Sequence, residues 1–181
     1  MARLIGIGGS LRQGSYNTGL LRAAAELMPQ GSSLEVHGIA GVPLYNADDE
    51  AAQGIPDPVT ALKEALAGAD GLVLATPEYN NSIPGVLKNA IDWMSRPPAD
   101  IGRVFGGKPV ALVGASPGGF GTILAQEAWL GVLRTLGTRP WFGKKMLVSK
   151  AGALFDEQGN LTDPKAREQL RDYLAAFVAA I

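Results

Sequence analysis

Residues 4–17 read "LIGIGGSLRQGSYN", in which a short apolar run is followed by a loop rich in glycine and hydroxyl groups. The run at residues 4–8 predicts a strand that is buried on both faces, as in parallel sheets. After the loop, apolar residues from Leu20 to Met28 recur at helical spacing. The start of such a helix offers free backbone N–H groups and the positive end of the helix dipole. The stretch therefore predicts a strand, an anion-binding loop and a helix, which together open an α/β fold.

The same alternation of apolar runs and helical patterns continues along the chain. Further strands are expected at residues 34–37, 71–76, 109–115 and 146–148, and helices at 58–67, 84–96, 121–136 and 170–181. This alternation indicates a parallel sheet with right-handed crossovers, and five strands suit the flavodoxin-like order 2-1-3-4-5. Residues 41–58 are expected to form a long loop. No repeat or linker interrupts the pattern, so residues 1–181 are expected to form a single domain.

Composition excludes several classes of protein. Hydrophobic residues make up 46% of the chain and charged residues 18%, which favours a packed globule. The net charge of −1, without a basic stripe, argues against a nucleic-acid or membrane-surface partner. With no cysteine and only one histidine, His37, neither a disulfide nor a metal cluster is expected. No segment reads as a signal peptide or a membrane span, so we expect a cytoplasmic protein.

Three polar, glycine-rich segments follow the first, third and fourth predicted strands. They are "GGSLRQGSYN" (residues 8–17), "TPEYNNSIPG" (76–85) and "GASPGGFG" (114–121). In an open parallel sheet, ligands bind at the carboxyl ends of the strands, where the strand order reverses. The sequence therefore predicts one ligand site built from these three loops.

The first of these loops has the donors that a phosphate needs. Hydroxyl and amide groups come from Ser10, Ser15 and Asn17, and Arg12 can add a charge-assisted hydrogen bond. Asn17 could instead be a simple N-cap of the following helix. A dinucleotide fingerprint requires glycine or alanine where this chain has Leu11, and no Gly-Lys-Ser/Thr ending is present. A single terminal phosphate is therefore favoured over a pyrophosphate or a plain turn.

The third loop matches a pattern that also occurs in serine hydrolases. Gly114-Ala-Ser116-Pro-Gly118 has the form of the G-x-S-x-G nucleophile elbow. The catalytic order requires a histidine after the serine, and none follows Ser116. Ser116 and Gly118 are therefore expected to supply backbone donors and close approach to a flat ligand, with a simple glycine turn as the alternative.

The three loops together resemble the NADPH-dependent FMN reductases of the flavodoxin-like superfamily, which include bacterial quinone, chromate and azo reductases. The first loop is similar to the family's G-S-x-R-x-x-S-x-N signature. The stretch "TPEYNNSIPGVLKNAIDW" (76–93) is close to its most specific motif. One departure is Asn81, where some relatives place a second aromatic residue. The similarity in pattern extends over nearly the whole chain.

This resemblance implies a bound FMN as the cofactor and NADPH or NADH as the electron donor. Hydride would pass by a ping-pong mechanism through FMN to quinones, azo compounds, metal oxyanions or free flavin, with no catalytic side chain. The residues implied to bind FMN form three groups. Those at the phosphate are Ser10, Leu11, Arg12, Ser15, Tyr16 and Asn17; those along the ribityl chain and ring are Pro77, Glu78, Tyr79 and Asn80; those at the pyrimidine side are Ser116 and Gly118.

Two other functions and an assembly remain as hypotheses. A non-enzymatic FMN electron carrier is one alternative, although such carriers are usually strongly acidic and this chain has a net charge of −1. A flavin-free dinucleotide-binding protein is the other. The resemblance also implies a homodimer or homotetramer. Trp129, Leu130, Val132 and Leu133 would suit such an interface, with packing in the core as the alternative.

Overall fold

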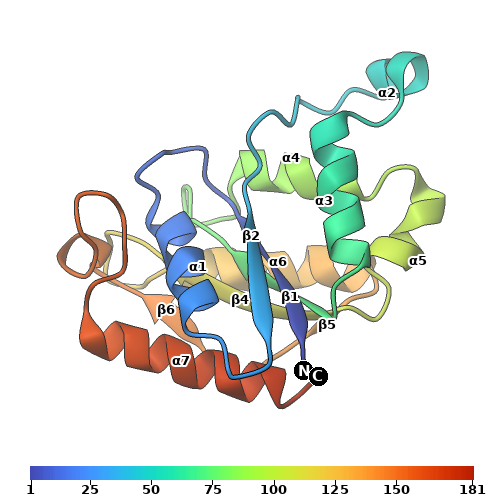
Figure 1. Ribbon diagram of the computed structural model, residues 1–181. Coiled ribbons are helices and arrows are strands. Elements are labelled where there is room, and N and C mark those ends of the chain that lie inside the picture. Colours follow the sequence, from blue (N-terminus) through green and yellow to red (C-terminus); the bar gives the residue numbers. More distant parts are fainter.

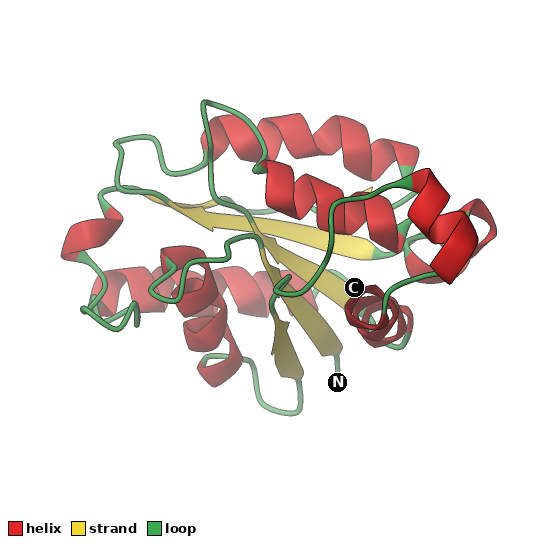
Figure 2. Ribbon diagram, turned by 90° about the horizontal axis from the view of Figure 1, so that it is seen from above, coloured by secondary structure: helices red, strands yellow, loops and turns green.

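A parallel β-sheet lies between two layers of helices in the computed structural model, which describes residues 1–181 (Figures 1 and 2). The strands are β1 (Arg3–Gly8), β2 (Ser33–His37), β3 (Gly71–Ala75), β4 (Pro109–Ala115), β5 (Arg139–Pro140) and β6 (Met146–Val148). Their order is β2-β1-β3-β4-β5, and β6 also pairs with β4. All of these pairs are parallel. The structure therefore confirms the flavodoxin-like order expected from the sequence.

The helices form one layer on each face of the sheet. They are α1 (Tyr16–Glu26), α2 (Ala47–Gln53), α3 (Asp57–Ala67), α4 (Gly85–Met94), α5 (Ile101–Val104), α6 (Ile123–Thr135) and α7 (Pro164–Val178), with 3₁₀ turns at Pro98–Asp100 and Ala151–Ala153. Apolar residues of α1 and α7 form one core cluster with the sheet, and those of α3, α4 and α6 form a second. None of the helices is both long and apolar enough to cross a bilayer.

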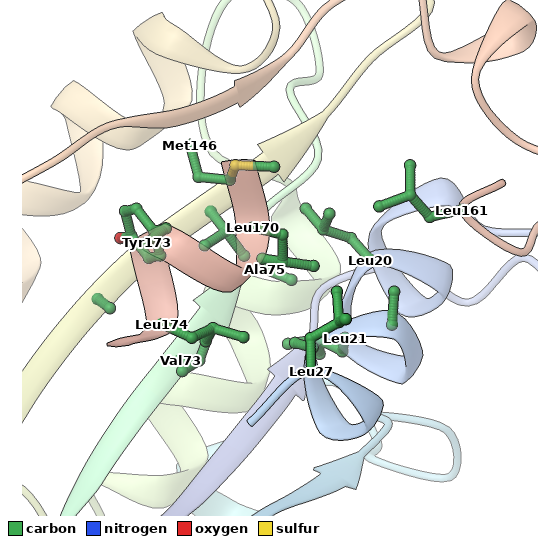
Figure 3. Packing of buried hydrophobic residues seen from close by; sticks show 14 of the residues in the cluster. Leu20, Leu21, Leu27, Val73, Ala75, Met146, Leu161, Leu170, Tyr173 and Leu174 are labelled. Carbon is green, nitrogen blue, oxygen red and sulfur yellow. The ribbon is translucent and has the colours of Figure 1, made fainter. Parts of the chain in front are cut away.

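Strand β3 shows how one strand serves both layers. Val73 and Ala75 pack against α1 and α7, whereas Leu72 and Leu74 face the other cluster, because successive side chains of a strand point to opposite faces. Figure 3 shows leucines of α1 and α7 meeting over Val73 and Ala75. All residues of β3 are buried, which explains the continuous apolar run in the sequence.

The fifth position of the sheet is occupied by two short strands instead of one. The expected strand at residues 146–148 is present as β6, whereas β5 was missed because its two residues carry no periodic pattern. β5 pairs with the beginning of β4 and β6 with its end. Between them the hydroxyl of Tyr173, on α7, donates to the Leu112 carbonyl oxygen at 2.9 Å. The Leu112 carbonyl oxygen thus has the tyrosine hydroxyl as its hydrogen-bond donor, where a continuous fifth strand would have supplied a backbone N–H.

The expectation that residues 41–58 form only a loop is wrong, because α2 lies within them. Asn46 caps α2 by accepting from the Asp48 backbone N–H at 3.0 Å, and acidic residues in the first turn favour the helix start. None of the residues of α2 is buried, so the sequence has no apolar stripe that would reveal this helix. The indole N–H of Trp93 holds the preceding segment by donating to the Pro43 carbonyl oxygen at 2.9 Å. Figure 1 shows α2 at the periphery of the fold.

The tryptophans and the apolar residues of α6 mostly serve the core. Trp93 and Trp129 are fully buried, as is Leu133. Trp141 packs edge-on against Tyr173 at a ring-centroid distance of 5.1 Å. Leu130 and Val132, in contrast, are half-buried at the surface of α6. The structure thus assigns Trp129 and Leu133 to the packing alternative and leaves only the other two near the surface.

Candidate cofactor site

Three loops meet at the carboxyl ends of β1, β3 and β4. We name them the first loop (residues 9–15), the second loop (76–84) and the third loop (116–122). They line a cavity of about 100 Å³. The lining residues are Ser10, Arg12, Ser15, Tyr16, Asn17, Pro77, Glu78, Tyr79, Ala115, Ser116 and Pro117. The predicted Leu11, Asn80 and Gly118 lie on the same loops but outside this lining, and Ala115 and Pro117 are additions that the sequence did not indicate.

The first loop delivers α1 to the cavity with its N-terminus open. Ser15 is the N-cap, and its Oγ accepts from the Thr18 backbone N–H at 3.3 Å. The interpretation of Asn17 as N-cap is therefore wrong, because the helix has already begun at Tyr16. The backbone N–H groups of Tyr16 and Asn17 precede the first available helical carbonyls and have no intrahelical partner. No acidic residue occupies the first turn of α1, so this helix end is attractive to an anion.

Gly9 lets the first loop pass close to the second. Its backbone N–H donates to the Ala75 carbonyl oxygen at 2.9 Å. A Cβ at this position would lie 2.5 Å from Leu87 Cδ2 and 2.9 Å from Pro77 Cδ. Only glycine fits without moving one of these neighbours.

Arg12 lies at the open side of the first loop. Its guanidinium carbon is 5.9 Å from the centroid of the Tyr16 ring, and the Tyr16 ring packs on Phe155 with centroids 5.0 Å apart. The only side-chain hydrogen bond of Arg12 is a long one to the Gly14 carbonyl oxygen, at 3.5 Å. Its charge is therefore available to a ligand. Leu11, which precedes it, is largely exposed.

Asn17 uses its side chain to tie α1 to the end of β4. Its Nδ2 donates to the Ala115 carbonyl oxygen, and its Oδ1 accepts from the Ala115 N–H, both at 2.9 Å. The residue is almost completely buried. Since both ends of the amide are occupied, only the backbone N–H of Asn17 is left for a ligand.

The second loop folds back on itself in a tight turn. Tyr79 and Ser82 exchange two backbone hydrogen bonds of 3.1 Å, while Asn80 and Asn81 between them have φ angles of 51° and 61°. A two-residue turn with both central residues in the left-handed region favours asparagine. This gives a physical role to Asn81. The turn holds Tyr79, which is 45% exposed, at the rim of the cavity.

Glu78 is the cap of α6. Its Oε2 accepts from the backbone N–H of Leu124 at 2.9 Å and of Ala125 at 3.1 Å. Thr122, the residue at the N-cap position, makes no side-chain capping bond. The Glu78 carboxylate is therefore engaged by protein donors, and its backbone is the part that remains for a ligand.

The third loop is fixed by backbone hydrogen bonds. The Ser116 N–H donates to the Val148 carbonyl oxygen at 3.0 Å, and the Gly118 carbonyl accepts from Lys150 at 2.8 Å. The hydroxyl of Ser116 donates to the Gly121 carbonyl oxygen within the same loop. This hydroxyl thus stabilises the turn, which agrees with the exclusion of a hydrolase triad.

The ion pairs that shift pKa values lie away from the cavity. A hydrogen bond from Arg96 lowers the pKa of Glu50, and one from Lys63 lowers the pKa of Asp100. Burial raises the pKa of Tyr173, whose hydroxyl closes the gap beside β4. These pairs stabilise loops and sheet edges, and none of them lines the candidate site.

Fold and site together define the class of protein. An open anion-binding helix start faces a second loop with two prolines and a glycine-rich third loop at the switch point of a flavodoxin-like sheet, as in proteins that bind a phosphate-bearing cofactor. Residues 2–153 match the model of the family described as NADPH-dependent FMN reductase. The chain belongs to this family. It is accordingly an oxidoreductase that uses FMN and NAD(P)H.

Relatives and solved structures extend the similarity over the whole chain. An NAD(P)H-dependent FMN reductase of Pseudomonas aeruginosa is 48% identical over 175 residues, which cover 97% of this chain and 92% of that protein. A 2-hydroxy-1,4-benzoquinone reductase of a Burkholderia species is 39% identical over 171 residues, covering 94% and 91%. Among solved structures, the flavoenzyme FerB, an NAD(P)H:(acceptor) oxidoreductase of Paracoccus denitrificans, superimposes with a TM-score of 0.85. It shares 32% identity, covering 99% of this chain and 96% of FerB.

Proposed function

We propose that this enzyme passes hydride from NAD(P)H through bound FMN to a quinone or a similar flat acceptor. Azo compounds, metal oxyanions and free flavin belong to the same proposal. The observation that carries it is the open N-terminus of α1, with the guanidinium of Arg12 beside it in no ion pair. The names of relatives, among them a benzoquinone reductase, favour the quinone class.

The first loop fits the FMN phosphate by its donor chemistry. We assign the phosphate to the hydroxyls of Ser10 and Ser15, the guanidinium of Arg12, and the backbone N–H groups of Tyr16 and Asn17. Leu11 belongs to the same loop, and its side chain is exposed. Since hydroxyl, guanidinium and helix-end donors converge here with no opposing carboxylate in the cavity lining except the engaged Glu78, a dianion is the ligand that suits them.

The other two loops are assigned to the sugar chain and the ring. Pro77, Glu78, Tyr79 and Asn80 would follow the ribityl chain and one edge of the ring, mainly through backbone atoms. Ser116 and Gly118 would meet the pyrimidine side. When bound, FMN supplies the redox chemistry, taking hydride from NAD(P)H and giving electrons to an acceptor in turn. The protein binds and orients it and leaves one face accessible, which suits a ping-pong mechanism.

Anaerobic addition of NADPH to the FMN-reconstituted protein tests this function. We expect the visible flavin band to bleach without a partner protein, and to return when a quinone is added. If FMN binds but stays oxidised with both NADPH and NADH, the chain is an electron carrier. If no flavin binds, the assignment of the first loop is wrong and the dinucleotide-binding alternative gains support.

We also propose that the enzyme assembles as a homodimer or homotetramer with the site near the subunit boundary. Phe120 is 81% exposed, and Ile123 and Leu124 are about 40% exposed. These apolar side chains lie where the third loop enters α6, beside the cavity. Sedimentation equilibrium measures the assembly directly, and a monomer at every concentration would contradict it.

A further inference from the structure

Two separate sets of side-chain hydrogen bonds attach the second loop to α6. The carboxylate of Glu78 accepts from the backbone N–H groups of Leu124 and Ala125, as described above. One helical turn further along, the indole N–H of Trp129 donates to Thr76 Oγ1 at 3.0 Å. Both contacts join residues about fifty positions apart in the sequence. The second loop is therefore held to α6 at two points.

The inner contact continues into the backbone of the second loop. Thr76 Oγ1 accepts from Trp129 and donates its own proton to the Pro77 carbonyl oxygen at 2.8 Å. Thr76 and Trp129 are both completely buried, so water cannot replace either bond. Because the Pro77–Glu78 peptide is trans, its N–H points away from the carbonyl that Thr76 holds. That N–H, on Glu78, makes no hydrogen bond within the protein and belongs to a residue that lines the cavity.

The third loop leads directly into α6, and contacts within the loop and to the end of β4 fix its conformation. The Ser116 hydroxyl donates to the Gly121 carbonyl oxygen. Gly114, at the end of β4, lies so close to Thr122 that a Cβ on it would be 1.7 Å from the threonine Oγ1. Thr122 ends the third loop, and its Oγ1 accepts from the side-chain Nε2 of Gln126, on α6, at 3.2 Å. The third loop is therefore linked to α6 through Thr122. Since the second loop is attached to the same helix, α6 sets the distance between the two loops.

We infer that Glu78 and Trp129 are positioning residues, which hold the second and third loops at the separation that the flavin ring needs. This inference rests on the proposed function. Trp129 fixes the orientation of the Pro77–Glu78 peptide through Thr76. The Glu78 carboxylate fixes the position of the second loop by its hydrogen bonds to the first turn of α6. The indole of Trp129 lies inside the core, and the carboxylate of Glu78 is occupied by α6. Neither group contacts the cofactor itself.

The test compares each variant with a matched control elsewhere in the chain. Glu78→Ala removes a carboxylate helix cap, and Asp163→Ala removes a similar cap from α7, where Asp163 accepts from the Ala166 N–H at 2.8 Å. Trp129→Phe removes a buried indole donor, and Trp93→Phe removes the donor to Pro43. All proteins are titrated with FMN, and the visible spectrum and midpoint potential of the bound flavin are recorded alongside Tm.

We expect Glu78→Ala and Trp129→Phe each to weaken FMN binding about 10-fold, as for one or two lost hydrogen bonds, and to shift the flavin spectrum or potential. The controls should lose comparable Tm with unchanged FMN affinity and spectrum. Glu78→Gln, which keeps an acceptor oxygen, should recover part of the affinity. If Trp129→Phe does not fold, Thr76→Val takes its place with the same expectation. If Glu78→Ala does not fold, Glu78→Gln takes its place, with a smaller loss of FMN affinity and the same kind of spectral or potential shift expected.

Two results would overturn the inference, and they are distinguishable. If all variants and controls lose Tm alike while FMN affinity, spectrum and potential stay those of the wild type, the contacts to α6 are ordinary stabilising contacts. If the wild type itself binds no FMN, the proposed function fails first and the inference fails with it.

Discussion

Helices α1 and α6 both begin at the same edge of the sheet, beside the same cavity, and their N-termini are completed in opposite ways. At α1 a neutral hydroxyl, that of Ser15, satisfies one N–H and leaves the earlier ones free. At α6 a carboxylate from a distant loop, that of Glu78, accepts from two N–H groups. One helix end therefore presents unmatched positive charge to the cavity, whereas the other is already neutralised within the protein.

The difference teaches which of the two helix ends can serve a ligand. A helix N-terminus attracts anions when its N–H groups are free and no protein carboxylate lies beside them. By this criterion α1 is open and α6 is closed. A site with one open helix end has one strong position for a phosphate, which favours a mononucleotide such as FMN over a bridging pyrophosphate. This agrees with the absence of glycine at Leu11, where a dinucleotide fingerprint would need it.

The largest effect should come from making α1 resemble α6. Ser15→Asp keeps a good N-cap but places a carboxylate beside the proposed phosphate position. Two like charges about 4 Å apart repel by about 4 kcal/mol at an effective dielectric constant of about 20, so FMN affinity should fall by about 100-fold or more. Fluorescence titration with FMN measures the loss, and Tm should stay close to that of the wild type.

The matched control for this substitution is Asn46→Asp at the N-cap of α2. Asn46 caps that helix with its side chain in the same way, and it does not line the cavity. We expect unchanged FMN affinity in this control. An affinity within about twofold of the wild type in Ser15→Asp itself would show that the phosphate does not bind at the start of α1.

The fold could be predicted from the sequence wherever buried residues form an apolar run or an apolar helical stripe. β1, β3 and β4 are buried almost throughout, so each reads as an apolar run bounded by polar residues. The sequence shows no such pattern for α2 or β5. None of the residues of α2 is buried, and β5 is only two residues long. Tertiary hydrogen bonds, such as that of Trp93 to Pro43, hold the segment before α2 instead. Such bonds cannot be inferred from local spacing.

For the candidate site, the sequence predicted the loops but not the partners of their side chains. The rule that ligands bind at strand ends brought the three loops together correctly. The amide of Asn17 nevertheless pairs with Ala115, and the carboxylate of Glu78 pairs with α6. Each of these partners is far away in the sequence. The residues that flank Asn17 or Glu78 in the chain do not indicate whether its side chain binds a ligand or forms a tertiary hydrogen bond. The choice between Ser15 and Asn17 as N-cap likewise depended on where the chain leaves the sheet.

A smaller effect is expected from removing the exposed cation while α1 stays open. Arg12→Ala deletes one charge-assisted contact to the proposed phosphate, and such contacts contribute about 1.5–3 kcal/mol, so FMN should bind about 10- to 150-fold more weakly. Arg134→Ala is the control, because Arg134 is exposed on α6 and lies outside the cavity lining. It removes the same charge from the protein, so a loss shared by both variants would indicate a general electrostatic effect.

Ionic strength separates the contribution of Arg12 from that of the helix end. Salt screens exposed charges, with a Debye length of about 10 Å at about 0.1 M, and acts less on a partly buried helix end. The FMN affinity of the wild type should therefore fall about 3-fold between about 50 and about 300 mM NaCl. The affinity of Arg12→Ala should change much less over the same range. Equal salt dependence in the two proteins would mean that Arg12 is not the cation at the phosphate. In that case the residual affinity would belong to α1 and its hydroxyl donors alone, and the contrast with the closed α6 would rest on N–H groups rather than on side-chain charge.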